Sequence, residues 1–211
     1  MIRAAVLDVD GVLTYFRSAW MHLHRILGTD AWATINRDAY RTGLINYRDW
    51  ALVDALLWFG VPKTWVEPPV TLRKGAVELL KLLRNNGIRI IALSGGLNYT
   101  EVPIKDYVDY FISNELIFDE DYSLISVKVN VENKDFIKDL LGKLGVTWDQ
   151  VLAVGDSDMD LPILKSARYS IAYNPMSEEV ANTARVIINS ETLYPVIDVI
   201  NAILKSDVYV K

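Results

Sequence analysis

The chain has 211 residues, 51% hydrophobic and 23% charged, the balance of a globular protein with one large domain or a domain plus a small insert. Its net charge of -5 and the lack of a basic block argue against a nucleic-acid-binding protein. The absence of cysteine excludes disulfides and thiolate zinc sites. No apolar run approaches the roughly 18 residues of a membrane span, and no signal-peptide pattern is present. We therefore expect a cytoplasmic protein that binds neither nucleic acid nor membrane.

The first predicted element is a buried strand over residues 2–7, an apolar run of the length typical of parallel sheets. Two carboxylates, Asp8 and Asp10, follow it, and the chain then turns at Gly11. In open α/β sheets, ligands bind outside the carboxyl ends of the strands. For an Asp-x-Asp pair alone, a solvated strand end is the favoured interpretation, so a functional role depends on the rest of the chain.

A helical stretch comes next, with predicted helices over 17–28, 30–42 and 46–59 and a break at the prolines after Glu67. Both histidines lie in this stretch, together with five of the six tryptophans: Trp20, Trp32, Trp50, Trp58 and Trp65. The pattern favours a small helical insert with its own aromatic core.

After Thr71 the chain alternates between strands and helices. Strands are predicted over 88–93, 110–112, 151–154, 169–172 and 186–188. Helices are predicted over 73–86, 99–107, 134–144, 159–166, 177–184 and 192–204. Residues 115–131 alternate in polarity around three acidic residues and indicate a β-hairpin. This alternation predicts a parallel sheet with helices on both faces.

Polar clusters follow three of the predicted strands. They are Asp8 with Asp10, the run Ser94-Gly95-Gly96, and the run 155–160 that contains Asp156 and Asp160. Parallel strands bring these ends to one edge of the sheet, and Lys134 at a helix start joins them. Clustered carboxylates repel one another, and Mg²⁺ with oxygen ligands is a natural solution. We expect the amides of Gly95 and Gly96 to open a helix and form an anion site.

Four motifs in chain order resemble those of the haloacid dehalogenase superfamily of phosphohydrolases, within it the phosphoserine phosphatase-like branch. The first is residues 8–12, the second Ser94-Gly95-Gly96, the third Lys134 and the fourth residues 155–160. The resemblance covers the whole chain. It implies an α/β fold with a three-layer Rossmann-like core over 1–14 and 73–211, a helical cap over 15–72, and a β-hairpin flap over about 115–131.

The resemblance also implies a mechanism. Asp8 attacks phosphorus and forms an aspartyl-phosphate, and Asp10 donates a proton to the leaving oxygen and later takes one from water. Mg²⁺ is held by the Asp8 side chain, the Asp10 carbonyl and Asp156, with Asp160 as a ligand or a supporting residue. Further residues are expected to bind the phosphoryl group: Gly11, Ser94, Gly95 and Lys134.

Arg17 departs from the family pattern, because phosphoserine phosphatases carry there a glutamate that reads the substrate amine. Arginine at this position favours an anionic or strongly polar substrate over a free amine. Arg41 and Arg48 are candidates to read a substrate carboxylate. Each residue also has a structural interpretation: Ser94 as a helix cap, Lys134 as a solvated lysine, Asp160 as a first-turn acid, and Arg17 packed on Trp20 or Met21. The aromatic residues of the cap are expected to pack in a core rather than to bind the substrate.

The sequence thus predicts a Mg²⁺-dependent phosphatase that acts on a small phosphorylated metabolite and exists as a monomer or homodimer. Phosphoserine phosphatase proper and a phosphotransferase with an acceptor other than water remain alternatives. A binding protein that kept the fold is disfavoured by the intact set of motif residues. Carbon–halogen hydrolysis would use the same nucleophile but does not need a second acid, so the presence of Asp10 favours a phosphate substrate.

Overall fold

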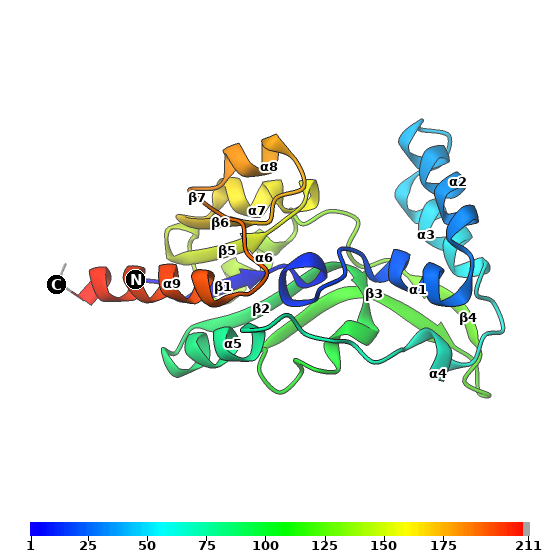
Figure 1. Cartoon of the computed structure of the whole chain (residues 1–211), viewed down its shortest axis with the longest axis horizontal. Helices are drawn as coiled ribbons and strands as arrows, with labels where there is room; N and C mark the ends of the chain where they lie inside the picture. The colour runs from blue at the N-terminus through cyan, green and yellow to red at the C-terminus, as the bar shows by residue number, and fades with distance from the viewer. Residues whose placement is uncertain (209–211) are drawn as a thin grey trace.

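The computed structural model describes residues 1–208 and has a seven-stranded sheet with the strand order β4-β3-β2-β1-β5-β6-β7 (Figure 1). The strands are β1 (Ala4–Leu7), β2 (Arg89–Leu97), β3 (Tyr110–Phe118), β4 (Leu124–Lys128), β5 (Val151–Gly155), β6 (Tyr169–Tyr173) and β7 (Val186–Ile188). Neighbouring strands are parallel except β3 and β4, which form an antiparallel hairpin. This confirms both the predicted parallel sheet and the predicted hairpin.

Helices cover both faces of the sheet, so the core has three layers. Alternate residues of β1 point to opposite sides: Leu7 packs with α5 (Ala76–Asn85) and α9 (Tyr194–Val208), and Val6 faces the other side. That other face is covered by three helices, α6 (Ile137–Lys143), α7 (Leu161–Ser166) and α8 (Glu178–Thr183). Burial on both faces explains why the central strands are apolar along their whole length. The predicted α/β Rossmann-like fold is confirmed.

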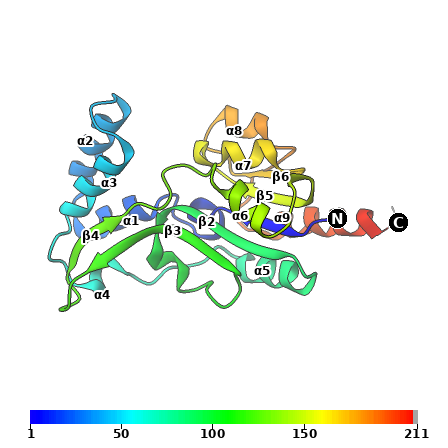
Figure 2. The ribbon, with the colours of Figure 1, turned by 180° about the vertical axis from the view of Figure 1, so that it is seen from behind.

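The helical stretch between β1 and α5 lies at the opposite end of the molecule from α9 (Figures 1 and 2). Its helices are α1 (Ala19–Leu27), α2 (Asp30–Arg41), α3 (Tyr47–Leu56) and the short α4 (Lys63–Val66). Ser18 caps α1 by accepting the Met21 N–H, and Gly28 ends it in the left-handed conformation. The three predicted helices are confirmed with trimmed ends. The proposed division into a cap over 15–72 and a core over 1–14 and 73–211 stays a prediction.

The hydrophobic core of this stretch is shared with the hairpin, so the expectation of an aromatic core of its own is wrong. Leu23 of α1 and the fully buried Trp58 belong to one cluster with Leu124 of β4. Trp32 and Trp65 are instead 60% and 64% exposed. The physical reason is that the short helices bury their apolar sides against the hairpin as well as against one another.

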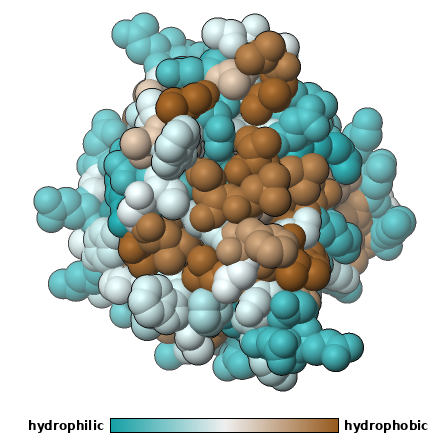
Figure 3. Space-filling model, turned by 90° about the vertical axis from the view of Figure 1, so that its right-hand side faces the viewer, coloured by the Kyte–Doolittle hydropathy of each residue, from teal (hydrophilic) through white to brown (hydrophobic). Residues whose placement is uncertain are grey.

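Apolar side chains also gather on the outside of this end of the molecule (Figure 3). The exposed large hydrophobic residues of helices α1 to α4 and of the segments between them are Ile26, Trp32, Ile35, Tyr40, Leu44, Leu52, Leu56, Phe59 and Trp65. The aromatic residues that were assigned to a core therefore divide among three places: the shared core, the outer surface and, as described below, a cavity.

Some predicted elements differ from the structure by more than trimmed ends. Strand β3 is one continuous element that includes both the predicted strand 110–112 and the first arm of the hairpin. The predicted helix 99–107 is a single 3₁₀ turn over Asn98–Glu101 followed by turns. The helix predicted to begin at Lys134 begins at Ile137. No helix within residues 1–208 is long and apolar enough to span a membrane.

Candidate active site

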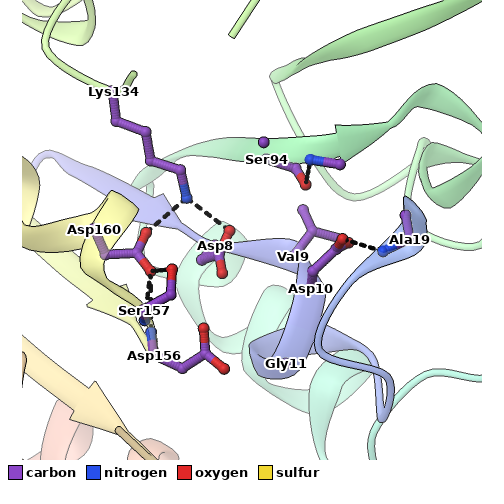
Figure 4. A network of polar contacts seen from close by, with 12 residues as sticks. Asp8, Val9, Asp10, Gly11, Ala19, Ser94, Lys134, Asp156, Ser157 and Asp160 are labelled. Carbon is purple, nitrogen blue, oxygen red and sulfur yellow. Dashed lines mark hydrogen bonds and ion pairs between the residues drawn. The ribbon is translucent and has the colours of Figure 1, made fainter. Parts of the chain in front are cut away.

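The candidate site lies where three neighbouring strands reach their carboxyl ends (Figure 4). Asp8 follows β1, Ser94 lies in the last part of β2, and Asp156 follows β5. Strand β1 pairs in parallel with both β2 and β5, which brings these three positions to the same edge. Lys134 reaches this edge from the segment before α6.

Lys134 joins two of the carboxylates. Its Nζ donates to Asp8 Oδ1 at 2.7 Å and to Asp160 Oδ1 at 2.6 Å, and all three side chains are buried. Burial lowers the pKa of Lys134, but the attraction of Asp160 and Asp8 outweighs it, so the net pKa is raised. The lysine is therefore a buried ammonium rather than a solvated residue at a helix start.

Asp160 has both of its carboxylate oxygens engaged. Oδ1 accepts from Lys134, and Oδ2 accepts from the N–H of Asp156, the N–H of Ser157 and the Ser157 hydroxyl at 3.0–3.1 Å. These bonds fix the loop after β5 and orient Lys134. The arrangement supports the interpretation of Asp160 as a residue that positions its neighbours.

The carboxylates of Asp8, Asp156 and Asp160 offer oxygens within 4.8 Å of one another. Asp156 Oδ2 is buried without a hydrogen-bond partner, and the Arg17 guanidinium is 3.7 Å from it. Burial, and next the Asp160 charge, raise the pKa of Asp156 to about 7, while Arg17 opposes the rise. Burial likewise raises the pKa of Asp8. An excess of buried negative charge with an unpartnered oxygen fits a hard divalent cation.

Asp10 lies on the other side of Asp8, towards the helical stretch (Figure 4). Its Oδ2 accepts the N–H of Ala19 at the start of α1, and its Oδ1 is buried without a partner. Burial raises the pKa of Asp10 to about 6, although the Ala19 hydrogen bond lowers it. A carboxyl group with a pKa near the working pH can both give and take a proton.

Two glycines are needed for close approach in the site. Gly11 has a φ of +83°, and a Cβ there would overlap the Asp156 carboxylate. A Cβ on Gly96 would lie 2.5 Å from Asp10 Oδ2. The Gly11 N–H donates to the Phe16 carbonyl at 2.7 Å, so this glycine provides space rather than a free donor for phosphate.

Gly95 and Gly96 do not open a helix, contrary to expectation. Both lie within β2, and the Gly96 N–H donates to the Ser94 hydroxyl at 2.9 Å. Ser94 is fully buried beneath this pair. The strand continues because β3 pairs with β2 as far as Leu97, across a bulge that follows Leu93. Any anion site here is formed by a strand end and not by a helix N-terminus.

A cavity of about 130 Å³ opens between the carboxylates and the helical stretch. Its core side includes Asp8, Asp10, Asp156 and Lys134, and Arg17 also lines it as expected. Neither of the other candidate substrate readers lines it: Arg48 pairs with Glu132 at 3.3 Å on the surface, and Arg41 is exposed. The structure therefore gives no support to Arg41 or Arg48 as a reader of the substrate carboxylate.

Six further residues line the cavity that the sequence patterns did not single out: Ser18, Trp20, Tyr47, Trp50, Ser157 and Met159. The three aromatic residues come from α1 and α3, whose apolar positions were assigned to a core. Met159 lies between Asp158 and Asp160 in the fourth motif. This position was the one sequence feature that could have indicated a place in the cavity.

Residues 2–168 match the family model of haloacid dehalogenase-like hydrolases. The chain belongs to this family. It is a haloacid dehalogenase-like hydrolase of the phosphatase type, which confirms the predicted enzyme class and the resemblance to the phosphoserine phosphatase-like branch.

Several relatives of this haloacid dehalogenase-like chain are called phosphoserine phosphatase. The one from Halobacterium salinarum is 28% identical over 201 residues, which is 90% of this chain and 95% of that protein. The one from Lactococcus lactis is 30% identical, over 64% of this chain and 67% of that protein. The match to the Archaeoglobus fulgidus protein spans 38% of its length, at 28% identity over 59% of this chain.

Solved structures share the fold. A phosphoserine phosphatase with an analogue of the phospho-aspartyl intermediate superposes with a TM-score of 0.78 at 20% identity, over 94% of this chain and 99% of that one. A phosphoserine phosphatase from T. onnurineus gives a TM-score of 0.69 at 22% identity, over 90% and 91% of the two chains.

Proposed function

We propose that the protein is a Mg²⁺-dependent phosphatase that hydrolyses a small phosphate monoester through an aspartyl-phosphate on Asp8. The observation that carries this proposal is the buried cluster in which Lys134 bridges Asp8 and Asp160 while Asp156 keeps an oxygen without a hydrogen bond. A protein that merely binds a ligand has no need to bury four carboxylates around one lysine.

In the proposed first step, the Asp8 carboxylate attacks phosphorus, the bond from phosphorus to the ester oxygen breaks, and Asp10 gives its proton to that leaving oxygen. In the second step, Asp10 takes a proton from water as the water attacks the aspartyl-phosphate, which releases phosphate and restores Asp8. The pKa of Asp10, about 6, suits both roles. Lys134, Ser94 and the Gly95 amide are proposed to bind the phosphoryl oxygens.

Asp8 and Asp156, with the Asp10 carbonyl, would hold the metal ion, and Asp160 would keep Lys134 and the loop in place. When bound, Mg²⁺ neutralises negative charge as the carboxylate and the phosphate meet. Lys134 supplies a fixed positive charge beside Asp8 in the absence of the ion.

Trapping of the intermediate tests the nucleophile. After acid quenching of a reaction with a ³²P-labelled aryl phosphate, wild type should carry hydroxylamine-sensitive label. Asp8→Asn should carry none, because an amide is a poor nucleophile. Asp10→Asn should still be labelled and should lose the label slowly, because removal of the general acid–base typically costs about 10²–10⁴-fold. Label on Asp8→Asn would show that another residue is the nucleophile.

Two alternative functions share this chemistry. Phosphoserine phosphatase proper is favoured by the names of the relatives. A phosphotransferase would share Asp8 but pass the phosphoryl group to an acceptor other than water. Turnover that rises with added alcohol acceptor, measured as transfer product against free phosphate, separates the second possibility from hydrolysis.

A further inference from the structure

The cap side of the cavity is aromatic. Trp20 of α1 with Tyr47 and Trp50 of α3 line the cavity that contains the catalytic carboxylates. The same three residues line a smaller hollow of about 30 Å³, together with Ala51 and Asp54. The three rings therefore form an aromatic wall between the larger cavity and the hollow, and the part of the larger cavity along this wall is called the slot.

Two of these rings have their polar atoms occupied elsewhere. The Trp20 Nε1–H and the Tyr47 hydroxyl both donate to the Gly95 carbonyl, at 3.1 and 3.2 Å, beside a third donor, Asn114 Nδ2, at 2.9 Å. Burial raises the pKa of Tyr47 to about 12, so its hydroxyl stays protonated and able to donate. The two residues therefore offer mainly hydrocarbon to a ligand.

The rings are also held in place by their neighbours. Tyr40 stacks on Trp50 with centroids 4.7 Å apart, Tyr47 meets Trp50 edge-on at 5.9 Å, and Trp20 stacks on Trp58 at 5.8 Å. A wall fixed in this way loses little entropy when a flat group packs against it.

Among the described residues that line the cavity and the hollow, no carboxylate outside the phosphoryl site is free to bind the ammonium group of an amino acid. Within residues 1–208, the carboxylates that line the larger cavity are Asp8, Asp10 and Asp156, all parts of the phosphoryl site. Asp54 in the smaller hollow already accepts from Asn36 Nδ2 at 2.8 Å and lies 3.3 Å from His24 Nε2. An ammonium group placed in the slot would be left without a counter-ion.

We propose that the slot formed by Trp20, Tyr47 and Trp50 selects phosphate monoesters whose alcohol carries a flat, apolar group such as an aromatic ring. This inference rests on the proposed phosphatase function and narrows its substrate class. The cavity of about 130 Å³ must also hold the phosphoryl group, and an apolar cavity that holds benzene measures roughly 150 Å³, so the group is limited to at most one ring.

Esters with similar leaving groups test the proposal. Benzyl phosphate, ethyl phosphate and phosphoserine are all esters of primary alcohols, so differences in kcat/KM report recognition rather than leaving-group acidity. With Mg²⁺ present, wild type should hydrolyse benzyl phosphate at least about tenfold more efficiently than the other two, the range expected for packing one ring against aromatic neighbours. Equilibrium binding of benzylphosphonate, followed by tryptophan fluorescence, provides a readout that does not depend on turnover.

Trp50→Ala should reduce the preference for benzyl over ethyl phosphate about tenfold and weaken benzylphosphonate to a similar degree. Trp32→Ala, an exposed tryptophan on α2, is the matched control and should change neither. Trp50→Leu keeps the bulk without the ring and replaces the alanine variant if that fails to fold.

A wild type that prefers phosphoserine, or a Trp50→Ala variant with an unchanged benzyl-to-ethyl ratio, would overturn the aromatic slot while leaving the phosphatase proposal intact. If none of the three esters is hydrolysed, the proposed function fails instead. In that case tight binding of benzylphosphonate, lost in Trp50→Ala, still supports the slot, and its absence overturns it.

Discussion

At the scale of single residues, Arg17 can serve two roles: it pairs with Asp156, and it lines the cavity where a substrate would bind. Its guanidinium is 3.7 Å from the Asp156 carboxylate, yet 47% of its side chain is exposed. It also lines the cavity beside the aromatic slot. An arginine this exposed can turn from Asp156 to an anionic group on a bound substrate at little cost, because a partly solvated ion pair contributes little.

A single substitution separates these two roles. Arg17→Gln should lower kcat/KM for 4-carboxybenzyl phosphate by a factor equivalent to about 1–3 kcal/mol, the range of a hydrogen bond to a charged group. Benzyl phosphate, which lacks the carboxylate, should change little. Arg41→Gln, on the exposed end of α2, is the control. An equal loss on both esters would mean that Arg17 acts through Asp156 and not on the substrate.

The clustering of the carboxylates was predictable because the rule that places them is topological. Asp8 and Asp156 follow apolar strands, and parallel strands bring their carboxyl ends to one edge whatever the details of packing. Trp50 was not predictable in this way. The helical periodicity shows that it lies on an apolar side of α3, but whether that side meets a core or a cavity depends on what packs opposite.

At the scale of elements, the feature with most consequence is the core shared by the helical stretch and the hairpin. Leu23 of α1, Trp58 and Leu124 of β4 are all fully buried in the same cluster. The β3–β4 hairpin therefore supports the helices above the site, and the two should unfold together. A flap without such a core would be only marginally stable by itself.

Neighbouring residues of β4 make a matched pair for testing this coupling. Leu124→Ala should lower the free energy of unfolding by about 2–5 kcal/mol, because it leaves a cavity in the shared core. Ile125→Ala, where the side chain is 39% exposed, should cost much less. Both values come from urea unfolding followed by circular dichroism. A separate early transition in Leu124→Ala, with the main transition unchanged, would show that the hairpin and its helices unfold independently of the core.

Most elements were predictable because apolar strands and amphipathic helices differ in period, and the exceptions have local causes. Helix α4 has four residues, too few to show a period. The predicted helix at Lys134 begins three residues late, because the lysine side chain is drawn into the site between Asp8 and Asp160. Strand β2 extends through two glycines, which propensity alone disfavours.

At the scale of the whole molecule, the buried site makes stability depend on pH. The pKa of Asp10 is raised to about 6 and that of Asp156 to about 7, above the value of about 3.9 for an unfolded aspartate. Between these values the folded protein binds more protons than the unfolded chain, so the free energy of unfolding falls as the pH rises.

Without metal, the protein should therefore melt at a higher temperature at pH 5 than at pH 8. Mg²⁺ at pH 8 should raise the melting temperature again, because an ion that binds the native state stabilises it by mass action. Thermal unfolding in EDTA and then in excess Mg²⁺ measures both effects. Asp156→Asn should show a weaker pH dependence and a smaller response to Mg²⁺. A metal-free protein that is more stable at pH 8 than at pH 5 would contradict this account.

The hydrogen bond from Trp20 to the Gly95 carbonyl gives the protein a built-in optical reporter. It joins α1 to β2 directly beside the cavity, so any separation of the helices from the sheet must break it and expose the indole to water. Indole emission shifts to the red when the ring becomes hydrated. The difference between wild-type and Trp20→Phe spectra would isolate this one signal from the other tryptophans. Stopped-flow emission could then follow closure over a ligand in real time without any attached dye.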